Sequence, residues 1–176
     1  MKQIGEMSQA ELAAYVQSHL RSQGIEVVLS GGATVGIYSN GQYVSKDIDL
    51  VNVQFAERRA IEFVMKEIGF IPVGWHFEHR DTDHIIEFPP GPLTLGNDRV
   101  EKLNEITLET GMLELLTPSD SVKDRLAHYF HWGDRQCLVQ AQLIAANHKI
   151  DIQAVRDWAL REGKGDAFDE IVGRLQ

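Results

Sequence analysis

The sequence predicts an α/β fold followed by a helical C-terminal part. β-rich runs and amphipathic helical patterns alternate as far as Leu116, whereas helical patterns alone follow the segment Thr117–Asp120. A length of 176 residues, 43% of them hydrophobic, suits a compact core, and the single cysteine, Cys137, excludes an internal disulfide framework. We therefore expect an α/β domain over residues 1–116 and a helical part over residues 117–176 that packs on it.

Helices and strands alternate in the first half of the chain. Ser8 and Glu11 form a capping box ahead of a helix that Gly24 ends. β-branched residues predict a strand over 25–29, and alternation of polar and apolar residues predicts another over 47–53. The other elements expected before residue 117 are a short helix over 33–38, an amphipathic helix over 56–68, two strands within 70–87, the second at 84–88, and a strand pair within 100–116.

Helix-start signals mark the second half of the chain. Thr117 suits the cap position, Pro118 the first helical position, and Asp120 the third residue after the cap. Asp134 and Asp151 suit the caps of later helices. The helices expected there cover 118–130, 134–147, 151–162 and 165–175.

The charge balance narrows the function classes. The chain carries 17 basic and 26 acidic residues, a net charge of −9. An acidic chain is a poor partner for extended nucleic acid, because neutralising phosphates supplies most of that affinity. It can still bind nucleotides where carboxylates hold Mg²⁺. No apolar run approaches the roughly 20 residues of a membrane helix, and no signal peptide is evident, so we expect a cytoplasmic protein.

Two short motifs carry the chemistry. Gly31 and Gly32 follow the first strand at a strand-to-helix corner, where glycines allow close backbone approach and the helix start favours an anion. Asp47 and Asp49 are two residues apart on the next strand, so both carboxylates point to one face. Adjacent carboxylates repel unless a positive group lies between them, and a divalent ion is the usual solution.

Together these motifs resemble the signature of the nucleotidyltransferase superfamily that includes DNA polymerase beta. The signature is an apolar residue, Gly, then Gly or Ser, a gap, and Asp-apolar-Asp/Glu-apolar, here Leu29–Gly32 and Asp47–Leu50. The Ser45–Asp49 run is similar to small bacterial members of the minimal and toxin-like branches. The resemblance covers about residues 25–90, and the segment Leu116–Leu126 also looks like uncharacterised members.

The resemblance implies a mixed sheet flanked by helices and assigns roles to individual residues. Ser30, Gly31 and Gly32 would hold the triphosphate of a nucleoside triphosphate (NTP). A third carboxylate is expected on a neighbouring strand, with Glu87 as the first choice and Asp83 as the second. The residues expected to ligate two Mg²⁺ ions and to be catalytic are Asp47, Asp49 and Glu87.

Two basic residues near the start of the helix at 118–130 are open to two interpretations. Lys123 and Arg125 are either ordinary surface charges or, because the resemblance places this helix near the cleft, contacts to nucleotide phosphate. We include Lys123 among the expected nucleotide-binding residues.

The leading functional hypothesis is an Mg²⁺-dependent nucleotidyltransferase that moves a nucleoside monophosphate from an NTP to a hydroxyl acceptor. Three classes of acceptor remain as alternatives: a small molecule, a protein side chain and an RNA end. The alternative is a non-catalytic nucleotidyltransferase-like binding module, which could be one half of a toxin–antitoxin pair.

Histidines suggest two other metal sites. His76, His79 and His84 lie with acidic residues in one stretch, but a hairpin there would separate them, and solvated hairpin residues are the simpler interpretation. His128 and His131 would share a helix face, yet no third ligand is evident. Cys137 has no evident activating base and is expected in the core.

Overall fold

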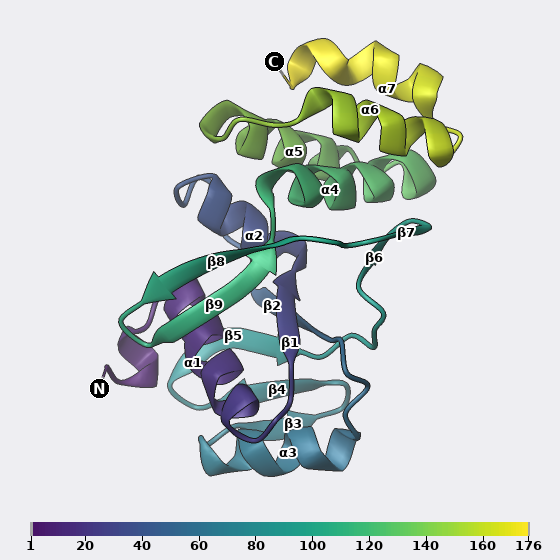
Figure 1. The fold of residues 1–176 in the computed structure, drawn as a ribbon. Coiled ribbons are helices and arrows are strands. Elements are labelled where there is room, and N and C mark those ends of the chain that lie inside the picture. The colour runs from purple at the N-terminus through teal and green to yellow at the C-terminus, as the bar shows by residue number, and fades with distance from the viewer. Residues whose placement is uncertain (1, 176) are drawn as a thin grey trace.

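A mixed sheet of seven strands forms the centre of the molecule, and helices flank it (Figure 1). The computed structural model describes residues 2–175. The strand order is β3-β4-β5-β2-β1-β9-β8, in which β2 runs parallel to β5 and β1 parallel to β9, while the other neighbours are antiparallel. The strands are β1 (Val27–Ser30), β2 (Asp47–Asn52), β3 (Ile71–Val73), β4 (His76–His79), β5 (Thr82–Glu87), β8 (Leu103–Leu108) and β9 (Gly111–Leu116).

The helices follow the positions that the sequence predicts. The capping box of Ser8 and Glu11 is present, and Thr117, Asp134 and Asp151 each accept a hydrogen bond as helix caps. The expected α/β class with a helical end is therefore confirmed. The helices are α1 (Gln9–Ser22), α2 (Gly31–Tyr38), α3 (Arg58–Glu67), α4 (Pro118–Trp132), α5 (Arg135–Asn147), α6 (Ile152–Arg161) and α7 (Gly165–Ile171).

The strands differ from the prediction in three details. Residues 70–87 hold three strands instead of two, because Gly74, with a φ of +60°, turns the chain between β3 and β4. The next turn lies at 80–81, so β5 starts earlier than expected, at Thr82. A small separate hairpin, β6 (Thr94–Leu95) with β7 (Asp98–Arg99), was not predicted.

Side chains alternate between the two faces of the central strands. Ile48, Leu50 and Ile86 are fully buried on one face, and α1 contacts β1, β2 and β9. The intervening residues point the other way. Gln17 of α1 donates to the carbonyl oxygens of Val27 and Glu114, which ties this helix to β1 and β9.

The helices from α4 to α7 stack at one end of the molecule (Figure 1). The α2 helix contacts α4 and α5, and the hydroxyl of Tyr38 donates to the carbonyl oxygen of Leu116 at 2.6 Å. Both parts of the chain contribute to one hydrophobic core. A boundary at residue 116 stays a prediction.

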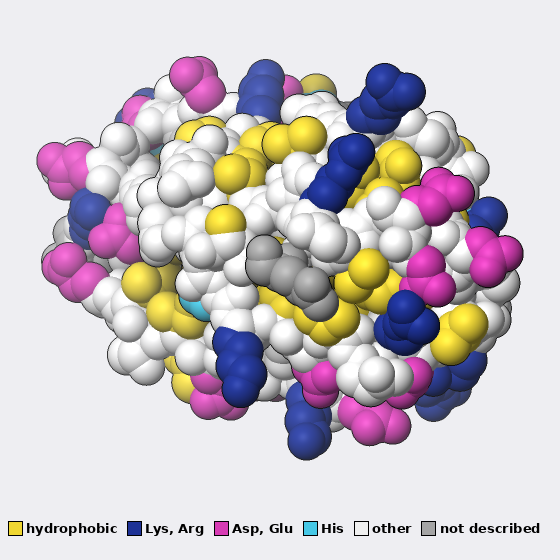
Figure 2. Space-filling model, turned by 90° about the horizontal axis from the view of Figure 1, so that it is seen from above, with side chains coloured by type: hydrophobic (Ala, Val, Ile, Leu, Met, Phe, Trp, Pro, Cys, Tyr) yellow, Lys and Arg dark blue, Asp and Glu magenta, His cyan; other side chains and the backbone are white. Residues whose placement is uncertain are grey.

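Figure 2 looks down on this helical end. Charged side chains of both signs lie among separate hydrophobic patches. Within residues 2–175, no helix has the combination of length and apolar character that crossing a membrane requires.

Candidate functional site

Three neighbouring strands place a row of polar side chains on one face of the sheet. In the strand register, Asp49 of β2 lies opposite Ser30 of β1 on one side and Glu87 of β5 on the other. Asp47 is two residues before Asp49 and shares its face. We call Ser30, Asp47, Asp49 and Glu87 the carboxylate row.

The register also separates the two residues considered as the third acid. Glu87 is the direct neighbour of Asp49, whereas Asp83 lies four residues earlier on β5, about 13 Å along the strand. The structure therefore brings Glu87 to Asp49 and leaves Asp83 at the far end. On the next strand, His76 of β4 lies opposite Glu87 in the register.

Asp49 carries the clearest electrostatic signature of the row. The pKa of its carboxyl group is raised to about 6, mainly by burial and in addition by the nearby charges of Glu87 and Asp47. Arg125 acts in the opposite direction but does not compensate. The folded chain thus holds acidic groups close together with too little positive charge among them.

The two glycines of the motif make room for β2 and the segment that leads into it. Gly31 has a φ of +69°, and a Cβ at this position would overlap the carboxylate of Asp49. A Cβ on Gly32 would lie 2.9 Å from the hydroxyl oxygen of Ser45. The sequence suggested space for a ligand, whereas the immediate reason for glycine at these positions is space for protein side chains.

The start of α2 faces the row with uncommitted polar groups. Ser30 occupies the cap position, but its side chain makes no capping hydrogen bond to the helix. Four N–H groups at a helix start have no partner within the helix. Since Ser30 pairs with Asp49, these donors lie next to the carboxylates. An anion held there by a cation on the row would find hydrogen-bond donors.

A buried ion pair from α4 adds to the row. Arg125 is 9% exposed, and its Nη2 donates to Asp124 at 2.6 Å. Its Nη1 donates to Gln140 of α5 at 3.3 Å. Both Arg125 and Asp124 influence the pKa of Asp49, so both belong to its surroundings. Sequence spacing did not reveal Asp124, because more than 70 residues separate it from Asp49.

Lys123 lies on the same helix but takes part in a different cluster. Its Nζ donates to Asp120 at 2.8 Å, and it lines a pocket with Asp98 and Arg161. None of the row residues lines that pocket. A contact of Lys123 with nucleotide phosphate stays a prediction.

The oxygen donors of the row suit a hard divalent cation, although they are not already grouped around one metal position. Within residues 2–175, no three His, Cys, Asp or Glu side chains are already grouped as a metal site. The chemistry of the donors nevertheless matches Mg²⁺, which takes carboxylate oxygens and completes its shell with water and phosphate oxygens. A cation here would also relieve the repulsion around Asp49.

The three histidines considered as a metal site each contact a different group. His76 pairs with Glu78 at 2.8 Å, the ring of His79 packs on Phe70, and Nδ1 of His84 lies 3.3 Å from the carbonyl oxygen of Lys46.

Two further expectations lie on the C-terminal helices. His128 packs on Trp132, whereas Nε2 of His131 lies 3.7 Å from Glu162, so this pair does not share a site. Cys137 is buried as expected, and burial raises the pKa of its thiol to about 11.

Solved structures of other proteins resemble this one. A crystal structure of an antigenic nucleotidyltransferase-like protein from Paracoccidioides brasiliensis has a TM-score of 0.61 at 14% identity, covering 95% of this chain and 91% of that chain. A solution structure of the antibiotic-resistance factor ANT(2'')-Ia has a TM-score of 0.54 at 13% identity, covering 92% and 91%. The chain has a nucleotidyltransferase-like fold.

The nucleotidyltransferase-like fold confirms the resemblance drawn from the glycine pair and the Asp-Ile-Asp motif. No protein-family model and no curated protein matches the sequence. At 13–14% identity, the likeness extends to the fold, and the activity has to be argued from the carboxylate row itself.

Proposed function

We propose that this protein is an Mg²⁺-dependent nucleotidyltransferase that transfers a nucleoside monophosphate from an NTP to a hydroxyl acceptor. The single observation that carries the proposal is the position of Asp49. It lies between Asp47, Glu87 and the start of α2, and its pKa is raised to about 6. Perturbed carboxylates of this kind gather at functional sites.

The residues of the row take separate roles in the proposed reaction. Asp47, Asp49 and Glu87 would hold two Mg²⁺ ions, which supply charge to stabilise the attacking and leaving oxygens when bound. Ser30 and the N–H groups of Gly31 and Gly32 hold the triphosphate at the start of α2.

The proposed transfer needs one base, which accepts a proton, and one leaving group. The acceptor hydroxyl forms a bond to the α-phosphorus, the bond from that phosphorus to the leaving oxygen breaks, and pyrophosphate departs. Glu87 accepts the hydroxyl proton. The chain contributes mainly the position of the reacting groups and a charged, partly desolvated setting.

The acceptor is proposed as a class. One structural neighbour is an antibiotic-resistance factor, which favours a small molecule. A protein side chain and an RNA end remain alternatives, whereas the net charge of −9 disfavours a long nucleic acid.

The test is a transfer assay that needs no prior choice of acceptor. Purified protein is incubated with each NTP labelled at the α-phosphate, with Mg²⁺ and with a cell extract divided into small molecules, protein and RNA. We expect label in one fraction, and a loss of about a hundredfold or more in Asp49→Asn and Glu87→Gln.

Asp83→Asn serves as the matched control, because it removes a carboxylate from the same strand away from the row. It should label as the unchanged protein does. Full transfer by Asp47→Asn and Asp49→Asn would disprove the assignment of the row.

A second candidate function rests on the open arrangement of the acids. Because no three of the described side chains are already grouped for a metal, a nucleotidyltransferase-like module that binds a nucleotide or a protein without catalysis is the alternative. A partnership of the toxin–antitoxin kind belongs to this alternative. NTP binding that is unchanged by removal of Mg²⁺, with no labelled product in any fraction, would favour it.

A further inference from the structure

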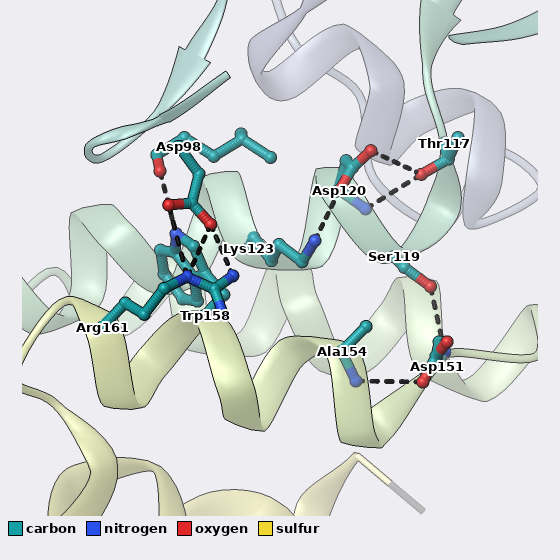
Figure 3. A network of polar contacts seen from close by, with 10 residues as sticks. Asp98, Thr117, Ser119, Asp120, Lys123, Asp151, Ala154, Trp158 and Arg161 are labelled. Carbon is teal, nitrogen blue, oxygen red and sulfur yellow. Dashed lines mark hydrogen bonds and ion pairs between the residues drawn. The ribbon is translucent and has the colours of Figure 1, made fainter. Parts of the chain in front are cut away.

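A pocket lies beside α4, apart from the carboxylate row. Its volume is about 620 Å³, which falls in the range of small-molecule sites. The hairpin β6–β7, the segment that follows it, and the helices α4 and α6 form its walls (Figure 3). The row residues are absent from its lining.

Hydrogen bonds hold the hairpin to α6 and to Glu162, the residue after this helix. This wall of the pocket is therefore held in place by the fold. Nε1 of the fully buried Trp158 donates to the carbonyl oxygen of Leu95 at 2.9 Å. The carboxylate of Glu162, only 4% exposed, accepts from the backbone N–H of Asn97 at 2.8 Å. Gly96 has no room for a Cβ beside Glu162.

The pocket lining carries four basic and three acidic side chains, a net charge of +1 in a chain whose net charge is −9. Two of its cations have partners, because Arg161 pairs with Asp98 and Lys123 with Asp120 (Figure 3). The other two, Arg99 and Lys102, make no ion pair with any residue of the described part of the chain, and neither does Glu101.

The paired cations also keep donors for a ligand. The bonds from Arg161 to Asp98 use its Nε and Nη2, which leaves Nη1, and Lys123 uses one of three N–H groups on Asp120. Two guanidinium groups and two ammonium groups therefore face one space. Such sets recognise phosphate, whose several oxygens accept forked hydrogen bonds.

The rest of the ligand must be polar and compact. Leu95 is the one apolar side chain in the lining, and the volume exceeds what a single phosphate fills. Asn97 and Glu101 offer acceptors for hydroxyl groups. We propose that this pocket binds a small hydroxylated molecule that carries a phosphate group. The inference does not depend on the transferase activity.

The test is an NMR titration of the full chain in low-salt buffer without Mg²⁺. Glucose 6-phosphate and ribose 5-phosphate are the probes, and glucose and ribose are the unphosphorylated controls. We expect amide shifts over residues 95–102 with the phosphorylated sugars and none with the plain ones. The double variant Arg99→Gln, Lys102→Gln should weaken binding about tenfold or more.

A charge-matched double variant controls for non-specific electrostatic attraction between the protein and the phosphate. Arg80→Gln with Lys66→Gln removes the same charge at exposed positions outside the pocket and should bind as the unchanged protein does. Equal weakening in both double variants, or no shifts with either phosphorylated sugar, would overturn the proposal. Asp49→Asn should leave this binding unchanged, and a loss there would show that the pocket is part of the row and would overturn the separate site.

Discussion

At Asp49, the folded state disfavours the charged carboxylate that metal binding would need. Its pKa is about 6 in the folded chain, above the ordinary value of 3.8, because of burial and of Glu87 and Asp47. The folded state therefore binds this proton more tightly than the unfolded state, and folding stability falls as the pH rises from about 4 to 6. Above about pH 6 the carboxyl group is ionised in the folded state as well, and the loss of folding stability is then complete.

Replacing this carboxylate is expected to stabilise the protein without metal. Asp49→Asn should raise the free energy of unfolding at pH 7.5 by about 1–3 kcal/mol, and the gain should disappear near pH 4. Urea unfolding of both proteins across this pH range, in Mg²⁺-free buffer, measures it. A difference that is the same at pH 4 and pH 7.5 would contradict the assigned cause, and Asp83→Asn should show no comparable gain.

Gly31 tests the contact between the helix start and the row. Both Gly31 and Gly24 have positive φ angles, but only at Gly31 would a Cβ meet another side chain, the carboxylate of Asp49. Gly24→Ala should cost about 1 kcal/mol of stability from backbone strain alone. Gly31→Ala should cost clearly more and should weaken nucleotide binding. Equal costs in thermal unfolding would show that Asp49 does not occupy that space.

At the scale of elements, the hairpin β6–β7 depends on one glycine. A Cβ on Gly96 would displace Glu162, whose carboxylate holds Asn97, whereas a Cβ on Gly163 meets nothing within 4 Å at a similar φ. Gly96→Ala should therefore destabilise the protein by about 1–2 kcal/mol more than Gly163→Ala. Hydrogen exchange at residues 94–99 should accelerate only in Gly96→Ala, and unchanged exchange would contradict the docking role of Glu162.

Local signals in the sequence predicted most elements because each is a short-range effect. The cap at Thr117 and the box at Ser8 depend on neighbours within four residues. The hairpin β6–β7 escaped prediction because strands of two residues have no periodicity, and a helix more than 60 residues later holds them. The turn at Gly74 similarly divides strands too short to show a pattern.

At the scale of the molecule, the site is assembled from elements distant in sequence. The motif and its resemblance gave Asp47, Asp49 and Glu87, and the register of β2 and β5 places Glu87 beside Asp49. Their catalytic and metal-binding roles remain predictions. The influence of Asp124 on Asp49 could not be predicted, because it depends on where the tertiary fold places α4 relative to β2.

The proposed function requires the carboxylate row to hold Mg²⁺ together with the phosphates of an NTP. Calorimetric titration with a non-hydrolysable ATP analogue, with and without Mg²⁺, tests it most directly in the unchanged protein, Asp49→Asn and Asp83→Asn. We predict Mg²⁺-dependent binding that Asp83→Asn retains and that Asp49→Asn weakens about tenfold or more. Equal binding by all three proteins, or binding indifferent to Mg²⁺, would show that the row does not hold the metal with the nucleotide.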